Sequence, residues 1–129
     1  MLPAQARMRS SQEFRTTVRR GVRSGSASLV VHADLADQRS PHSAETDSST
    51  RVGFVVSKRV GNAVTRNRVK RRLRHMVAAR LSFGGKLPRD LRIVVRALPP
   101  AALEPQRLAS DFDAAWSASL SKVCRWAER

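Results

Sequence analysis

The stretch that decides the fold is RVGFVVSKRVGNAVTRNRVKRRLRH, which spans residues 51–75. It begins with a run of apolar, mostly β-branched residues that predicts a strand over 51–57. A turn is expected at 60–62, and a helix from about 63 to 81 follows it. Gly53 interrupts the strand pattern, which indicates a bulge or the close approach of another group to the backbone. A strand that leads through a turn into a long helix is therefore the centre of the predicted fold.

The predicted helix has one apolar face. Its apolar side chains gather on one side of a helical wheel: Val69, Leu73, Met76 and Val77. This face is expected to pack against the sheet. Arg66 projects in nearly the same direction but precedes the stripe by one turn, so we expect it to overhang the sheet edge and border a cleft. Arg68 lies on the opposite flank, so Arg66-Asn67-Arg68 is interpreted as a junction between two contacts.

The same helix and the turn before it carry a dense run of positive charge. Eight basic residues and no acid lie in 58–75: Lys58, Arg59, Arg66, Arg68, Lys70, Arg71, Arg72 and Arg74. Like charges at this spacing oppose helix formation, and those near the helix N-terminus also oppose the macrodipole. A merely solvated helix face would be expected to mix both signs. A polyanion that neutralises the run explains the pattern better, so nucleic acid is the predicted partner.

The whole composition supports the same class of partner. The chain has 129 residues, with 25 Lys and Arg against 10 Asp and Glu, a formal net charge of +15. At this length a single domain over 1–129 is expected. An anionic membrane surface is the second candidate, but the apolar stripe contains no Trp or Phe and is needed to cover the strands. No signal peptide and no apolar run of about 20 residues is recognised, so the chain is expected in the cytoplasm.

Outside the central stretch the chain predicts two more strands and two more helices. The expected helices are 11–20 and about 105–126, and the expected strands are 27–34 and 90–97. The order along the chain is α-β-β-α-β-α, an α+β fold (an α/β sandwich) in which helices cover a small mixed sheet. Residues 1–6 are expected to form a flexible tail, and the Ser-rich segment 35–50 a mobile loop.

No catalytic or metal-binding pattern stands out. The three histidines lack the spacing of metal ligands, and no nucleophile has a general base and a third partner nearby in the sequence. The single cysteine excludes an internal disulfide. Cys124 lies beside the apolar stripe of the last helix and is expected to be a small core residue.

The stretch 51–75 resembles the signature of the bacterial ribonuclease P protein subunit. The matching features are Val-Ser-Lys-Arg at the strand end, Gly61, Ala63-Val64, Arg66-Asn67-Arg68 and Lys70-Arg71. Arg7-Met8-Arg9 and Glu13-Phe14 resemble the family's entry to its N-terminal helix, and 90–96 resembles its strand after the basic helix. The resemblance covers the chain apart from its termini and the Ser-rich loop.

The resemblance implies a function. The small basic subunit of ribonuclease P binds the large catalytic RNA, contacts the 5′ leader of precursor tRNA and assists endonucleolytic removal of that leader. The RNA subunit carries the catalysis and holds the essential Mg²⁺ ions. The chain is therefore expected to have no catalytic residue of its own, no small-molecule substrate and no membrane partner, and no metal site is assigned to the protein itself.

The family's residue roles can be carried to matching positions. The RNA-binding roles fall on Lys58, Arg59, Arg66, Asn67, Arg68, Lys70, Arg71 and Arg74. The family's central cleft, in which leader nucleotides lie against the sheet, corresponds to Phe14, Val18 and His32. Such clefts stack single-stranded bases with little sequence preference. Val18 and His32 stand where the family usually has aromatic residues, which weakens a stacking account, and His32 is equally well explained as an ordinary strand residue on the open face.

The resemblance also implies a left-handed crossover from the strand 51–57 through the basic helix to the strand 90–97. General rules favour the right-handed form in ~98% of such connections. Two other classes of function remain open: a structural RNA-binding protein, such as a small ribosomal protein, and an autonomous nuclease. If the protein stimulates leader removal by ribonuclease P RNA at low Mg²⁺, it has the family's function and is not merely a structural RNA-binding protein. Cleavage by the protein alone would indicate an autonomous nuclease.

Overall fold

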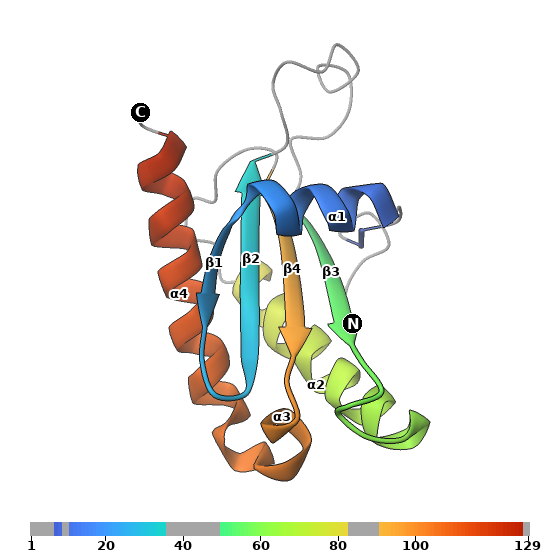
Figure 1. Ribbon diagram of the computed structural model, residues 1–129. Coiled ribbons are helices and arrows are strands. Elements are labelled where there is room, and N and C mark those ends of the chain that lie inside the picture. The colour runs from blue at the N-terminus through green and yellow to red at the C-terminus, as the bar shows by residue number, and fades with distance from the viewer. Residues whose placement is uncertain (1–6, 9–10, 36–49, 83–90, 128–129) are drawn as a thin grey trace.

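The computed structural model describes residues 7–8, 11–35, 50–82 and 91–127, which form a four-stranded sheet with helices on both faces (Figure 1). The strands lie side by side in the order β1 (Val22–Gly25), β2 (Leu29–Leu35), β4 (Leu91–Ala97) and β3 (Arg51–Val56). β2 pairs antiparallel with both β1 and β4, whereas β3 runs parallel to β4. The small mixed sheet of the predicted α+β class is confirmed.

The helices divide between the two faces of the sheet. They are α1 (Ser11–Arg20), α2 (Ala63–Ser82), α3 (Pro100–Leu103), the short 3₁₀ helix η2 (Pro105–Arg107) and α4 (Leu108–Ala127). α1 crosses one face, and α2 and α4 cover the other (Figure 1). Because successive strand residues point to opposite faces, Val31 of β2 joins the core beneath α2 and α4, whereas His32 turns towards α1.

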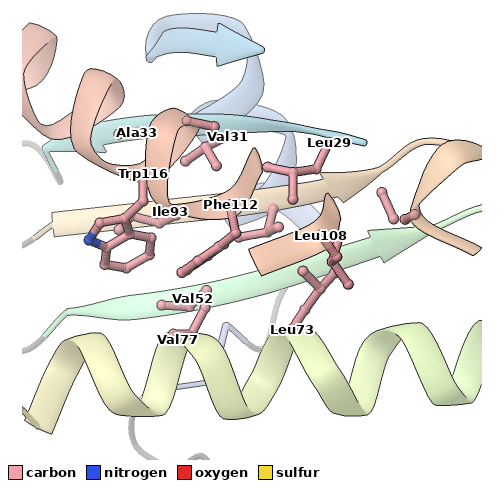
Figure 2. Packing of buried hydrophobic residues seen from close by; sticks show 14 of the residues in the cluster. Leu29, Val31, Ala33, Val52, Leu73, Val77, Ile93, Leu108, Phe112 and Trp116 are labelled. Carbon is pink, nitrogen blue, oxygen red and sulfur yellow. The ribbon is translucent and has the colours of Figure 1, made fainter. Parts of the chain in front are cut away.

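The hydrophobic core lies between the sheet and the pair α2 and α4 (Figure 2). α2 contributes Leu73 and Val77, and α4 contributes Phe112 and Trp116, whose ring centroids are 5.4 Å apart. These side chains point towards the apolar residues of the strands, among them Ile93 (Figure 2). Burial of such side chains contributes about 1.5–3 kcal/mol each. The core therefore holds α2 by its apolar stripe and leaves its basic flanks outside.

The crossover from β3 through α2 to β4 is left-handed. In the view of Figure 1 β3 and β4 both point downwards, β3 lies to the right of β4, and α2 passes behind the sheet. When the picture is turned so that the strands point up, the chain moves one strand to the right with its helix on the far side. That arrangement is the rarer hand, and it agrees with the family resemblance.

α1 is attached to the sheet near both of its ends. Near its start, the Glu13 carboxylate lies 3.1 Å from Arg51 Nη1 on β3 and 3.6 Å from Arg92 Nε on β4. At its end, α1 is followed by Gly21, which packs closely against the backbone: a Cβ atom added at Gly21 would stand only 2.5 Å from the carbonyl oxygens of Ala33 and Thr17. Only glycine fits at this point without a shift of the backbone, and the predicted helix range 11–20 is confirmed.

Several local predictions were wrong. β1 was not expected, because its sequence VRSG carries too few apolar residues to suggest a strand. The last helix begins at about Pro105 as predicted, but its first turn is the 3₁₀ helix η2, and α4 begins only at Leu108. Cys124 is exposed and not part of the core.

The predicted tail 1–6 lies outside the described residues, as does most of the predicted loop 35–50. At the two ends of that loop, Leu35 closes β2 and Thr50 precedes β3.

Candidate nucleic-acid interface

Asn62 starts the basic helix α2. Its side-chain Oδ1 accepts a hydrogen bond from the backbone N–H of Thr65 (2.9 Å), and its carbonyl oxygen accepts one from that of Arg66 (2.8 Å). This is the geometry of an N-cap, which satisfies amides that have no partner within the helix. The first turn contains no acidic residue. The positive end of the helix macrodipole therefore lies beside the cations of the Arg66-Asn67-Arg68 motif.

The two flanks of α2 face in opposite directions, as the helical wheel predicted. On one flank, Arg72 Nη2 donates a hydrogen bond to the carbonyl oxygen of Pro105 (3.1 Å), so this side faces η2. On the other flank, Lys70 and Arg74 line a pocket at the edge of β3. Arg66 is half-buried and its Nε is covered, without a hydrogen-bond partner among the described residues. The interpretation of the motif as a junction between two contacts stays a prediction.

The positive charge of this surface is not balanced within the described part of the chain. The eight basic residues of 58–74 form no ion pair there. The ion pairs between described residues lie elsewhere: Glu13 with Arg51 and Arg92, Asp113 with Arg80, and Glu104 with Arg107. Most of the predicted RNA-binding side chains away from the β3 edge are exposed: Lys58, Arg59, Asn67, Arg68 and Arg71. An exposed, unpaired cationic surface of this kind attracts polyanions.

On the opposite face of the sheet, α1 and the strands enclose a cleft of about 300 Å³. The three residues assigned to the leader cleft, Phe14, Val18 and His32, all line it. Phe14 and Val18 are one helical turn apart on α1, and His32 faces them from β2. Val55 and Val94 supply further apolar surface from β3 and β4. The sequence positions are therefore brought together, although their role in binding RNA stays a prediction.

Phe14 lies directly over Gly53 of β3. A Cβ at Gly53 would stand 2.4 Å from Cζ and 2.5 Å from Cε1 of the Phe14 ring. Carbon atoms in ordinary contact are about 3.5–4.0 Å apart. The close approach suggested by Gly53 in the sequence is therefore confirmed, and the approaching group is the aromatic ring of the cleft.

His32 forms the polar part of the cleft wall. Its side chain is 5% exposed, and neither ring nitrogen has a hydrogen-bond partner among the described residues. Burial lowers the pKa of His32 from its ordinary value of 6.5, and the positive charges of Arg23 and Arg96 lower that pKa further. The ring is therefore neutral at physiological pH, with one donor nitrogen and one acceptor nitrogen. Such a ring can bond to the edge of a nucleobase.

Three arginines at the cleft were missed by the sequence-based assignment. Arg15 and Arg19 of α1 and Arg96 of β4 line the same cleft as Phe14. The signal was present in the sequence: Arg15 and Arg19 are one turn apart, and Arg96 alternates with the core residues of its strand. An apolar cleft with cations at its rim can accept bases inside and phosphates outside.

Among the described residues no group of three or more His, Cys, Asp or Glu side chains is placed to hold a metal ion. No helix within the described ranges is long and apolar enough to cross a membrane.

These features define a class: a small basic α+β protein with a cationic helix on one face of its sheet and a cleft on the other. The family model for ribonuclease P matches residues 2–119, and the chain belongs to the ribonuclease P protein family. It is therefore a subunit of ribonuclease P, with a role in tRNA processing.

Individual relatives agree with this assignment. The ribonuclease P protein component of Streptomyces bikiniensis is 51% identical over 118 residues, covering 89% of this chain and 92% of the relative. That of Kocuria rhizophila is 49% identical over 116 residues, with the same coverage of 89% and 92%. The solved RNase P protein of Staphylococcus aureus superposes with a TM-score of 0.71 at 24% identity, covering 92% of this chain and 96% of that one. The last comparison shows a shared fold.

Proposed function

We propose that this protein binds the RNA subunit of ribonuclease P through the basic surface of α2 and holds the 5′ leader of precursor tRNA in the cleft beneath α1. The RNA subunit then carries out hydrolysis and holds the Mg²⁺ ions, in the cytoplasm. The protein contributes substrate affinity and position. No residue of the chain is assigned a catalytic role.

The observation that carries this proposal is the placement of the two surfaces around one edge of the sheet. The cleft and the basic flank of α2 lie on opposite faces of a single sheet, and both reach β3, its edge strand. A protein with this arrangement can contact two RNA segments at once. Its cleft is apolar with cationic sides, which suits a single strand, whereas the exposed arginines of α2 suit the phosphates of a folded RNA.

The experiment is reconstitution with ribonuclease P RNA and precursor tRNA at low Mg²⁺. We expect the RNA and protein together to remove the leader much faster than the RNA alone, and the protein alone to cleave nothing. RNA binding without stimulation would instead indicate a structural RNA-binding protein. Cleavage by the protein alone would refute the division of labour proposed here.

The leader cleft is tested with one variant and one control. Phe14→Ala removes the aromatic ring from the cleft, and Leu103→Ala removes an apolar side chain that is 77% exposed on α3, far from the cleft (Figure 1). Phe14→Ala should weaken holoenzyme binding of precursor tRNA more than of mature tRNA, and Leu103→Ala should change neither. Equal losses for both RNAs with Phe14→Ala would assign that ring to stability alone.

A further inference from the structure

A second, smaller pocket lies at the edge of β3, where α1 and α2 approach each other around the sheet. Its volume is about 150 Å³, and three cationic side chains line it: Arg7, Lys70 and Arg74. The rest of the lining comes from Met8, Phe14 and the β3 residues Val52, Gly53 and Phe54. Of the three cations, Arg7 matches none of the positions to which an RNA-binding role was assigned from the sequence.

The backbone fixes Arg7 in place. Arg7 forms an isolated parallel bridge with Val52 of β3, and the Met8 amide donates a 3.0 Å hydrogen bond to the Val52 carbonyl oxygen. The Met8 side chain is 8% exposed. Because main-chain pairing and a buried neighbour hold this short segment, Arg7 is positioned at the pocket before any ligand arrives.

The charge in this pocket has no counterpart in the described part of the chain. Arg7, Lys70 and Arg74 are each partly buried, and none of them forms an ion pair with a described acid. The Nε of Arg7 is covered from solvent and has no hydrogen-bond partner there either. Three partly buried like charges repel each other and lose hydration, so the arrangement is unfavourable until an anion enters. A guanidinium is well matched to the oxygens of a phosphate.

The pocket also adjoins the leader cleft. Phe14 lines both spaces: its ring borders the apolar cleft that contains His32, and it also borders the cationic pocket. A nucleotide needs this pairing of surfaces: an apolar wall for its base and a cationic group for its phosphate. The spacing between the two is set by a single aromatic side chain.

We infer that Arg7, Lys70 and Arg74 form a binding site for one backbone phosphate of the leader, an inference that rests on the proposed function. The site lies where the leader strand would leave the cleft and pass over the edge of β3 towards α2. Arg7 is the residue that specifies this site, because Lys70 and Arg74 also belong to the general basic surface. The site binds a phosphodiester of any sequence.

The test uses the reconstituted holoenzyme and precursor tRNAs in which one leader phosphate at a time is a neutral methylphosphonate, with a 2′-deoxyribose at that linkage. For wild type, we expect one linkage at which neutralisation weakens binding about 10-fold, the size of one lost charge-assisted contact. Arg7→Gln should weaken binding of the unmodified leader by a smaller factor, because Lys70 and Arg74 still contact the phosphate. Neutralising that one linkage should then cost Arg7→Gln clearly less than it costs wild type, whereas the other linkages should behave alike in both proteins. Arg125→Gln, at the distant end of α4 (Figure 1), is the control and should retain the wild-type pattern.

The outcomes separate this inference from the proposed function. If Arg7→Gln weakens binding by the same factor for every modified leader, the site does not hold a leader phosphate and the inference fails. Reduced affinity for ribonuclease P RNA, with unchanged leader binding, would likewise overturn the inference, because it would show that Arg7 contacts the catalytic RNA. If the wild-type holoenzyme does not distinguish precursor from mature tRNA, the proposed function fails first. Thermal unfolding of Arg7→Gln monitors the fold, because the Val52 pairing uses the main chain alone.

Discussion

Gly53→Ala is expected to disable the leader cleft while leaving the fold intact. The added Cβ would stand 2.4, 2.5 and 3.1 Å from three atoms of the Phe14 ring, so the ring must move by about 1 Å or more to restore ordinary contacts near 3.5 Å. Overpacking of this kind costs about 1–3 kcal/mol. Because open pockets adjoin the ring, it can swing outwards, and we expect a cost at the low end, about 1 kcal/mol.

The consequence for binding should be larger than the consequence for stability. A displaced ring occupies the space in which a base would lie, and it no longer separates the cleft from the cationic pocket. Stacking on an aromatic platform contributes about 1–3 kcal/mol per base. We therefore expect holoenzyme affinity for precursor tRNA to fall by about 10-fold with little change for mature tRNA, measured by equilibrium binding at fixed salt.

A double-mutant cycle decides whether the ring causes the effect. In a Phe14→Ala background the clash is absent, so adding Gly53→Ala should cost nothing or stabilise slightly, because alanine restricts the unfolded chain more than glycine does. The coupling energy in urea unfolding should be about 1 kcal/mol, within the range for residues in contact. Equal destabilisation by Gly53→Ala in both backgrounds would refute the assignment of the clash to Phe14.

Three further perturbations test separate parts of the structure. Arg68→Ala should weaken RNA binding and reduce the salt dependence of log K by about 0.7–0.9 if one phosphate contact is lost; a slope equal to that of the control Arg125→Ala would show that Arg68 is merely solvated. Asn62→Ala removes the cap on the Thr65 amide and should lower the unfolding free energy by about 1 kcal/mol in thermal or urea melts; no change would deny the cap a role. Because the pKa of His32 is lowered in the folded protein, the unfolded chain binds a proton more readily, and the free energy of unfolding should fall as the pH drops below about 6.5. His32→Gln should flatten this part of the pH profile of stability; parallel profiles for the two proteins would contradict the prediction.

The sequence predicted the elements whose periodicity was strong. The apolar stripe of Val69, Leu73 and Val77 predicted both that this segment is helical and which side of it is buried. The alternation of strand residues around His32 predicted which face of β2 lines the cleft. Gly53 signalled a close approach, but only the structure identifies Phe14 as the group that approaches. Periodicity reports which side of an element is buried and does not report what lies opposite.

Other features were beyond sequence reasoning for physical reasons. β1 is stabilised by pairing with β2 and not by its own apolar residues, so tertiary contacts override a weak local preference. Arg7 meets Lys70 and Arg74 only because a short segment pairs with the edge of β3, and residues so far apart in the sequence leave no pattern of spacing. The hand of the crossover came from the family resemblance and contradicts the general rule.

The sheet separates the layer that keeps the protein folded from the layer proposed to recognise RNA. No residue of α1 belongs to the hydrophobic core cluster, which lies wholly on the side of α2 and α4. Substitutions at Val18 and its neighbours in the cleft are therefore expected to have little effect on the packing that stabilises the molecule, and any effect on the proposed leader binding should be separable from it. With this construction, an aromatic side chain in the cleft should be replaceable by an aliphatic or imidazole side chain at small cost to stability. The same construction also makes the cleft a site that can be redesigned for other single-stranded ligands without rebuilding the core.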